Sequence, residues 1–173
     1  TRTYKQASIL DQDENLREIT GNIVFPGFTA PKLLWIQDNK PELFEQVAKV
    51  LLPASYLGYY LTGEFFMDMS DAAGTSWLDV GNRCWSEYAL KASNMRSDQM
   101  PKLLEGSQVA SSVSKFIADE LGIPSGVSVV AGAGDNAAAA CGVGIMKEGQ
   151  GFVSIGTSGV LLTARNTYSP LAQ

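Results

Sequence analysis

The feature that most constrains the fold is a β-branched run that passes through a glycine turn into a helix-prone segment. Residues 127–131 read Val-Ser-Val-Val-Ala, residues 132–134 are Gly-Ala-Gly, and residues 136–141 are Asn, four alanines and Cys. Short β-branched runs favour strands, and glycines permit a tight strand-to-helix turn. An alternation of strands and helices is typical of α/β proteins. This segment therefore predicts an α/β fold.

The remaining elements are expected to be mostly helical before this segment and to form a hairpin after it. Two short strands are predicted at 152–155 and 160–163, with a turn at 156–159 between them and a boundary between Gly142 and Gly151. Residues 68–79 are rich in Ser, Asp, Gly and Thr, which favour turns and loops. Helices are predicted at 4–16, from an N-cap at Thr29, from Pro41 through an apolar pattern to 47, at 54–61 ended by Gly63, at 87–92, and at 112–121 ended by Gly122.

The composition excludes several classes of function. The chain has 173 residues, with 13 Lys and Arg against 18 Asp and Glu, so its net charge of −5 lacks the basic footprint of a nucleic-acid-binding protein. It contains no histidine, which excludes Ser-His-Asp triads and histidine zinc sites within it, and no residue is assigned as a metal ligand. Cys84 and Cys141 form no CxxC pair. With no signal peptide and no run of about 18 apolar residues, a cytoplasmic protein without a membrane span is expected.

Asp135, which directly follows the glycine turn, is a candidate catalytic residue. The segment Gly132-Ala133-Gly134-Asp135-Asn136-Ala137 matches the loose dinucleotide pattern G-x-G-x-x-A. NAD binding is disfavoured because Asp135 would repel the pyrophosphate and because residues 149–165 contain no Asp or Glu to bind the ribose. Two interpretations remain: Asp135 is an N-cap of the following helix, or it is a reactive carboxylate at the edge where open α/β sheets bind their ligands.

Three other segments carry possible chemistry. The turn Ser154-Ile155-Gly156-Thr157-Ser158-Gly159 could present N–H groups and hydroxyls to a phosphate, although it is not a Walker loop and a plain hairpin turn would look the same. Residues 27–39 read as a capped amphipathic helix with Trp35 in the core and Lys32 on a solvated face. Residues 69–75 read as a buried turn. Taken one by one, each segment has an ordinary structural explanation.

Taken in order, these segments resemble the FGGY family of carbohydrate kinases. Residues 27–39 are similar to the first signature of that family, through Lys32 and Trp35, and residues 68–75 and 134–138 are similar to its xylulose kinases in particular. The resemblance runs through essentially the whole chain. It implies an ATP-dependent kinase of the actin-like ATPase (ribonuclease H-like) architecture, in which two domains close on a cleft.

The resemblance also assigns roles to residues. Asp135 matches the base that receives the proton of the sugar hydroxyl as this hydroxyl attacks the γ-phosphate of ATP. Asn136 matches a sugar-contacting residue, and Gly156-Thr157-Ser158-Gly159 matches a loop that meets the nucleotide phosphates. The implied substrates are D-xylulose, converted to D-xylulose 5-phosphate, and ATP, with Mg²⁺ as the metal cofactor.

Departures from the family pattern suggest that the chain is a central piece of such an enzyme. It lacks a Gly-rich phosphate hairpin with an early Asp and the sugar-binding His of the family, and the adenine-binding part would follow Gln173. Residues 1–145 would then be the second half of the N-terminal sugar-binding domain, and residues 150–173 the first strands of the C-terminal ATP-binding domain. We expect the isolated piece to be inactive, and its open sheet edges favour a homodimer.

Other functions stay open on the sequence alone. The missing phosphate hairpin would suit a non-catalytic module that binds sugar but not ATP. Another FGGY kinase that acts on a different polyol would carry most of the same motifs. An NAD-dependent dehydrogenase is the least favoured alternative, because it rests on the loose glycine pattern alone.

Overall fold

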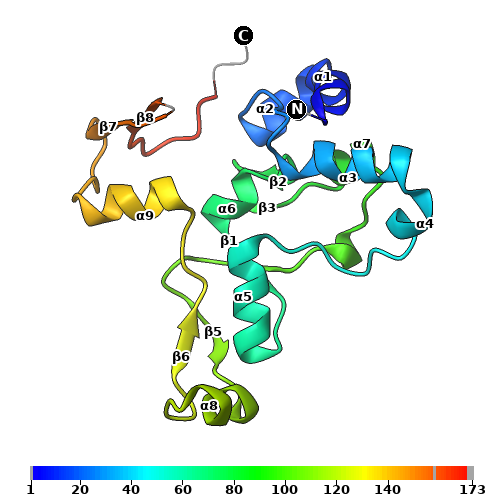
Figure 1. Cartoon of the computed structure of the whole chain (residues 1–173). Coiled ribbons are helices and arrows are strands. Elements are labelled where there is room, and N and C mark those ends of the chain that lie inside the picture. The colour runs from blue at the N-terminus through cyan, green and yellow to red at the C-terminus, as the bar shows by residue number, and fades with distance from the viewer. Residues whose placement is uncertain (1, 158, 171–173) are drawn as a thin grey trace.

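The computed structural model describes residues 2–157 and 159–170 as a mixed α/β structure of short strands and helices (Figure 1). The helices are α1 (Tyr4–Asp11), α2 (Glu14–Thr20), α3 (Thr29–Asn39), α4 (Pro41–Phe44), α5 (Pro53–Thr62), α6 (Met69–Ala73), α7 (Glu87–Ala92), α8 (Lys115–Leu121) and α9 (Asp135–Gly142), with a 3₁₀ turn at Ser97–Gln99. The strands are β1 (Phe66–Asp68), β2 (Leu78–Asp79), β3 (Cys84–Trp85), β4 (Lys102–Leu104), β5 (Val109–Ser112), β6 (Ser128–Val130), β7 (Gly151–Ile155) and β8 (Gly159–Thr163).

The N-terminal segment forms two helices and not the single helix predicted for residues 4–16. The first helix ends at Asp11, and Asp13 caps the second, because its Oδ1 accepts hydrogen bonds from the N–H groups of Asn15 (3.0 Å) and Leu16 (3.2 Å). Helix α1 then packs on both α2 and α3 (Figure 1). The apolar pattern was therefore correct about helicity but could not reveal the break at Asp13.

Trp77 is the largest fully buried side chain in the described residues, with 1% of its surface exposed. Its indole Nε1 donates a hydrogen bond to Ser93 Oγ at 2.7 Å, and the Ser93 hydroxyl donates in turn to the carbonyl of Leu90 at 3.1 Å. A buried indole N–H needs such a partner, so this contact fixes how the ring lies in the core. The core around it consists of Ala7, Leu10, Leu16, Val24, Ala30, Leu33, Val50, Ala89, Leu90, Met95 and Met100.

The strands of the described residues pair two by two. Strands β1 and β4 are parallel, with Phe66 opposite Lys102, whereas β2–β3, β5–β6 and β7–β8 are antiparallel. The prediction that residues 68–79 form only turns and loops was wrong, because this segment contains the end of β1, helix α6 and β2. Polar and small residues favour turns, but here Asp68 caps a one-turn helix instead.

The start of α3 also differs from the prediction. Phe28, not Thr29, occupies the N-cap position, and its side chain makes no cap bond. The backbone N–H of Ala30 donates instead to the carbonyl of Thr75 at 3.0 Å, so a distant segment satisfies the helix end. Helix α4 ends at Phe44, short of the predicted pattern to residue 47.

Other predicted elements are confirmed within a residue or two. Helices α5 and α8 end at Gly63 and Gly122, which adopt the left-handed conformation with φ of 82° and 67°. Helix α7 has the predicted bounds, and β7–β8 is the predicted hairpin. Helix α8 begins at Lys115, later than predicted, because Ser112 belongs to β5 and Ser114 caps the helix.

The surface of the described residues carries two free cysteines, Cys84 in β3 and Cys141 in α9, and both are exposed. Within that part of the chain, none of the helices combines the length and the apolar character that crossing a membrane requires.

Replacing the core tryptophan, Trp77→Ala, should lower the free energy of unfolding by about 3–5 kcal/mol, because it removes a fully buried ring and leaves a cavity. Trp77→Phe keeps an aromatic ring and loses the bond to Ser93 and only part of the buried volume, while the Ser93 hydroxyl still bonds Leu90, so its loss should be smaller. Urea denaturation of the protein measures both. Equal losses for the two variants would show that the hydrogen bond, and not the buried volume, matters most.

Candidate active site

The carboxylate of Asp68 organises one side of the site, where β1 ends and α6 begins. Only 4% of Asp68 is exposed, and its Oδ1 accepts hydrogen bonds from the backbone N–H groups of Ser70 (2.8 Å) and Asp71 (3.0 Å) and from the Ser70 hydroxyl. These are the free N–H groups of the first helical turn, which an aspartate N-cap satisfies. The cap turns the chain sharply from strand to helix at the base of the site.

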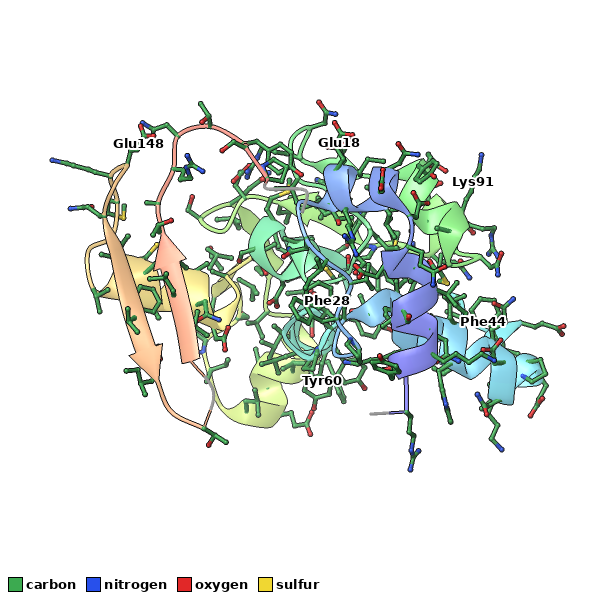
Figure 2. All side chains as sticks on the ribbon, turned by 90° about the horizontal axis from the view of Figure 1, so that it is seen from above. Glu18, Phe28, Phe44, Tyr60, Lys91 and Glu148 are labelled. Carbon is green, nitrogen blue, oxygen red and sulfur yellow. The ribbon has the colours of Figure 1, made fainter. Side chains whose placement is uncertain are left out.

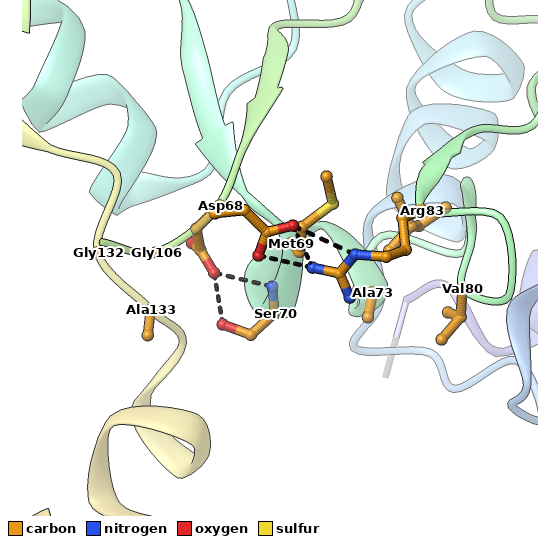
Figure 3. A pocket seen from close by; sticks show the side chains of 11 residues that line it. Asp68, Met69, Ser70, Ala73, Val80, Arg83, Gly106, Gly132 and Ala133 are labelled. Atoms are coloured by element: carbon orange, nitrogen blue, oxygen red, sulfur yellow. Dashed lines mark hydrogen bonds and ion pairs between the residues drawn. The ribbon is translucent and has the colours of Figure 1, made fainter. Parts of the chain in front are cut away.

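The loop between β6 and α9 is fastened to this turn and to a second one. Its Ala131 and Gly132 N–H groups donate to the carbonyls of Gln108 and Gly106, each at 3.0 Å, and the Gly134 N–H donates to Ser70 Oγ at 2.7 Å. Figure 3 shows this loop passing Ser70 at Gly132 and Ala133 on its way into α9. The loop thus brings the first residue of α9, Asp135, beside α6.

A cleft of about 590 Å³ opens between α3, α6 and the start of α9. It brings together residues from 27–39, 68–75 and 134–138, which are far apart in the sequence and were considered there as separate candidates. Its lining consists of Gly27, Phe28, Thr29, Lys32, Leu52, Ser70, Asp71, Ala73, Gly74, Gly134, Asp135, Asn136, Ala137 and Leu162. The lining is mixed, with small residues that leave room for a ligand and polar groups that can orient it.

Asp135 is exposed and is the first residue of α9, whereas Gly134 is the N-cap. The interpretation of Asp135 as a helix cap is therefore wrong. Its Oδ1 accepts hydrogen bonds from the backbone N–H (2.7 Å) and the side-chain Nδ2 (3.1 Å) of Asn136. Within the described residues its other oxygen accepts no hydrogen bond, so Asp135 presents an acceptor to the cleft beside the positive end of a helix dipole.

Asp71 is a second carboxylate of the cleft, and the sequence reasoning missed it. Burial raises the pKa of the Asp71 carboxyl, and the negative charges of Asp68 and Asp135 raise this pKa further. No donor among the described residues bonds this carboxylate. Its Oδ1 also lies only 2.8 Å from the point where a Cβ on Gly134 would sit, so a side chain at that position would require the Asp71 carboxylate to shift. The signal in the sequence was Asp68 followed by Ser70 and Asp71, a helix-capping pattern that was interpreted as a turn.

Lys32 supplies the basic side chain among the residues that line the cleft, and it is exposed, as predicted for a residue on a solvated face. It is the second residue after Ala30, whose N–H is bonded to the Thr75 carbonyl at 3.0 Å. This backbone bond ties α3 to the segment after α6, so the two walls of the cleft are held together. The lining residues of the cleft thus include one cationic side chain and two carboxylates.

The predicted phosphate loop stands apart from this cleft. Gly156, Thr157 and Gly159 lie at the exposed tip of the β7–β8 hairpin, and Ser158 lies outside the described residues. None of these three described residues lines the cleft, which the hairpin reaches through Leu162. Figure 2 shows the hairpin on the side of the molecule away from Phe44. The described structure thus brings Asp135 and Asn136 together but not the loop with them.

A smaller cavity of about 360 Å³ lies on the other side of α6 (Figure 3). Ser70 and Ala73 line both cavities, so α6 is the partition between them. At its edge, Arg83 forms an ion pair with Glu105 at 2.6 Å, and both side chains are more than half exposed. Such an exposed pair contributes little to stability.

Comparison with known proteins decides the family. Residues 1–142 match the FGGY family of carbohydrate kinases, N-terminal domain. The chain belongs to the FGGY family of carbohydrate kinases. This confirms the resemblance seen in the sequence motifs. The chain is 55% identical to the xylulose kinase of Escherichia coli (strain K12) over 144 residues, which are 83% of this chain and 30% of that relative. It is 52% identical to the xylulose kinase of Klebsiella pneumoniae over the same shares.

Solved structures of two kinases share this fold. A crystal structure described as a xyloylose kinase from Brucella ovis matches with a TM-score of 0.95 and 52% sequence identity, over 99% of this chain and 36% of that one. Plasmodium falciparum glycerol kinase with ADP matches with a TM-score of 0.84 at 22% identity, over 94% of this chain and 33% of that one, and shows the shared fold. This FGGY chain spans about a third of the length of the relatives it matches.

The raised pKa of Asp71 predicts a pH-dependent cost to the stability of this FGGY domain. The folded state binds the Asp71 proton more tightly than the unfolded state, in which the pKa of this carboxyl is about 3.9. As the pH rises from about 3.9 through the higher pKa of the folded state, Asp71 therefore lowers the free energy of unfolding. Asp71→Asn removes the titration. The variant should therefore gain stability relative to the wild type between about pH 4 and pH 7, as measured by urea denaturation. A gain that shrinks as the pH rises would contradict the assignment.

Proposed function

We propose that these residues are part of an ATP-dependent kinase that converts D-xylulose to D-xylulose 5-phosphate. The observation that carries this proposal is the exposed carboxylate of Asp135 in a cleft assembled from the three segments that resemble the family signatures. The choice of sugar follows the relatives, which are xylulose kinases at 55% and 52% identity.

Asp135 is the proposed base. As a sugar hydroxyl oxygen forms its bond to the γ-phosphorus of ATP, the bond from that phosphorus to the β–γ bridging oxygen breaks, ADP leaves, and the hydroxyl proton passes to the free oxygen of Asp135. Phosphoryl transfer proceeds through a loose transition state in most analyses, so positioning and charge balance dominate catalysis. The two bonds from Asn136 hold Oδ1 and leave the other oxygen for the sugar. The Asn136 side-chain carbonyl can accept a bond from a second sugar hydroxyl.

The nucleotide side of the proposal rests on the hairpin β7–β8. We propose that its turn, Gly156-Thr157-Ser158-Gly159, meets the ATP phosphates when a second domain closes over the cleft, as the actin-like ATPase architecture implies. Residues 1–145 would then belong to the sugar-binding domain and residues 150–173 would begin the ATP-binding domain. The family match to residues 1–142 supports the first of these assignments.

Mg²⁺ is proposed to arrive with the nucleotide. No group of three or more acidic or cysteine side chains suited to a metal ion occurs in the described part of the chain. Mg²⁺ in kinases is held largely by phosphate oxygens and water, with one or two carboxylates. The cytoplasmic location and the homodimer expected from the sequence remain predictions.

The direct test is ADP release by the full-length protein that contains these residues, with MgATP and a panel of D-xylulose, ribulose, gluconate and glycerol. Turnover with D-xylulose alone is expected. Turnover with another member of the panel would keep the family and the role of Asp135 but replace the substrate. Binding of sugar without any turnover would contradict the proposal and favour a non-catalytic sugar-binding module.

Replacing the base, Asp135→Asn, should lower kcat for D-xylulose by about 10²-fold or more, because the amide cannot take the hydroxyl proton. Steady-state ADP release measures this effect. The matched control is Asp119→Asn, the same change at an exposed aspartate on α8 away from the cleft, which should leave kcat unchanged. Near-normal turnover by Asp135→Asn would remove Asp135 from the mechanism.

A further inference from the structure

A relay of hydrogen bonds links a buried charge to the residue that precedes Asp135. The Ser70 hydroxyl donates to Asp68 Oδ1, and the backbone N–H of Gly134 donates to Ser70 Oγ at 2.7 Å. Asp68 is 4% exposed, whereas Ser70 is exposed and lines both cavities, of which Figure 3 shows the smaller. The relay is therefore a bridge between α6 and the start of α9.

The direction of each bond in the relay is fixed by its chemistry. An ionised carboxylate only accepts, so the single hydroxyl proton of Ser70 must point to Asp68. The lone pairs of Ser70 Oγ are then left to accept from the Gly134 N–H. A hydroxyl bonded to a carboxylate is a stronger acceptor, because linked hydrogen bonds polarise one another. No other arrangement of protons satisfies both partners.

The backbone that this bond holds has little freedom to shift. A Cβ on Gly134 would lie 2.8 Å from Asp71 Oδ1, so this peptide lies close to the Asp71 side chain of α6. Two residues earlier, Gly132 is bonded to the Gly106 carbonyl at 3.0 Å, and a Cβ on Gly106 would lie 2.6 Å from the Gly132 carbonyl oxygen. The loop is thus clamped on both sides immediately before Asp135.

We propose that Ser70 is a positioning residue of the kinase, which sets the place of the Asp135 carboxylate through the N–H of Gly134. This inference rests on the proposed function of Asp135. A base must lie within about 2.6–3.2 Å of the hydroxyl whose proton it takes. A misplacement of about 1 Å can cost about 10²-fold in rate, so a bond one residue away from the base can control turnover.

The test compares Ser70→Ala and Ser70→Thr in the full-length protein, with ADP release measured against D-xylulose concentration. Ser70→Ala removes both bonds of the relay and should lower kcat by about tenfold or more, while KM for the sugar changes by less than about threefold. Ser70→Thr keeps the hydroxyl, and its added methyl has open space because Ser70 is exposed, so it should restore most of the rate.

Ser86→Ala serves as the matched control for stability. Ser86→Ala also removes a hydroxyl that caps a helix, because the Ser86 Oγ accepts a hydrogen bond from the Ala89 N–H at 3.2 Å. Ser86 does not line the cleft. It should lower the thermal midpoint without changing kcat. If Ser70→Ala behaved in the same way, with normal kcat and a lower midpoint, the role of Ser70 would be structural and the inference would be overturned.

A double variant separates this inference from the proposed function. If Ser70 acts through Asp135, adding Ser70→Ala to Asp135→Asn should not lower the residual rate any further. A further loss of the full tenfold would mean that Ser70 acts independently of Asp135, which overturns the inference. Normal turnover by Asp135→Asn alone would instead overturn the proposed function, whatever Ser70→Ala does.

Discussion

The buried carboxylate of Asp68 is the group on which the geometry of the cleft depends. Removing a carboxylate from water is costly unless hydrogen bonds replace the lost hydration, and Asp68 receives two backbone bonds and one hydroxyl bond. Those bonds define where β1 ends and where α6 begins. Because the same hydroxyl also receives the Gly134 N–H, the start of α9 is placed relative to that buried charge.

Three carboxylates lie close enough in and beside the cleft for their charges to interact. The negative charges of Asp68 and Asp135 raise the pKa of Asp71. Within the described residues, no N–H or O–H group donates a hydrogen bond to the Asp71 carboxylate. Such an arrangement costs stability, and natural proteins retain costly groups where they serve a function. Lys32 also lines the cleft and adds one positive charge to its rim. A substrate with several hydroxyl groups would find both donors and acceptors there.

The sequence predicted elements whose signals are local. Helix α5 is marked by Pro53 at its start and Gly63 at its end, and the β7–β8 hairpin is marked by its glycines. The start of α3 was misplaced, because the carbonyl that satisfies its Ala30 N–H comes from a distant residue, Thr75. Helix α6 was missed because a five-residue helix has too little periodicity to be recognised.

The candidate site was predicted in part. Asp135 and Asn136 were identified from the glycine turn and the family resemblance, and the structure places both in the cleft. That the cleft also contains Asp71 could not be predicted from local pattern, since this depends on long-range contacts between α6 and the loop before α9. Gly134 lies close to Asp71 because of tertiary packing. The two glycines in the sequence allow this close approach but do not predict it.

The two exposed thiols offer a way to observe the cleft directly. Cys141 lies on α9, the helix that begins with Asp135, and Cys84 lies on β3. A fluorophore or spin label on each cysteine would report the distance between α9, which carries Asp135, and β3, which lies outside the cleft. Because these are the only cysteines in the sequence, no background thiol from these 173 residues needs to be removed first. The native sequence therefore already contains a reporter pair for any movement of α9 during ligand binding.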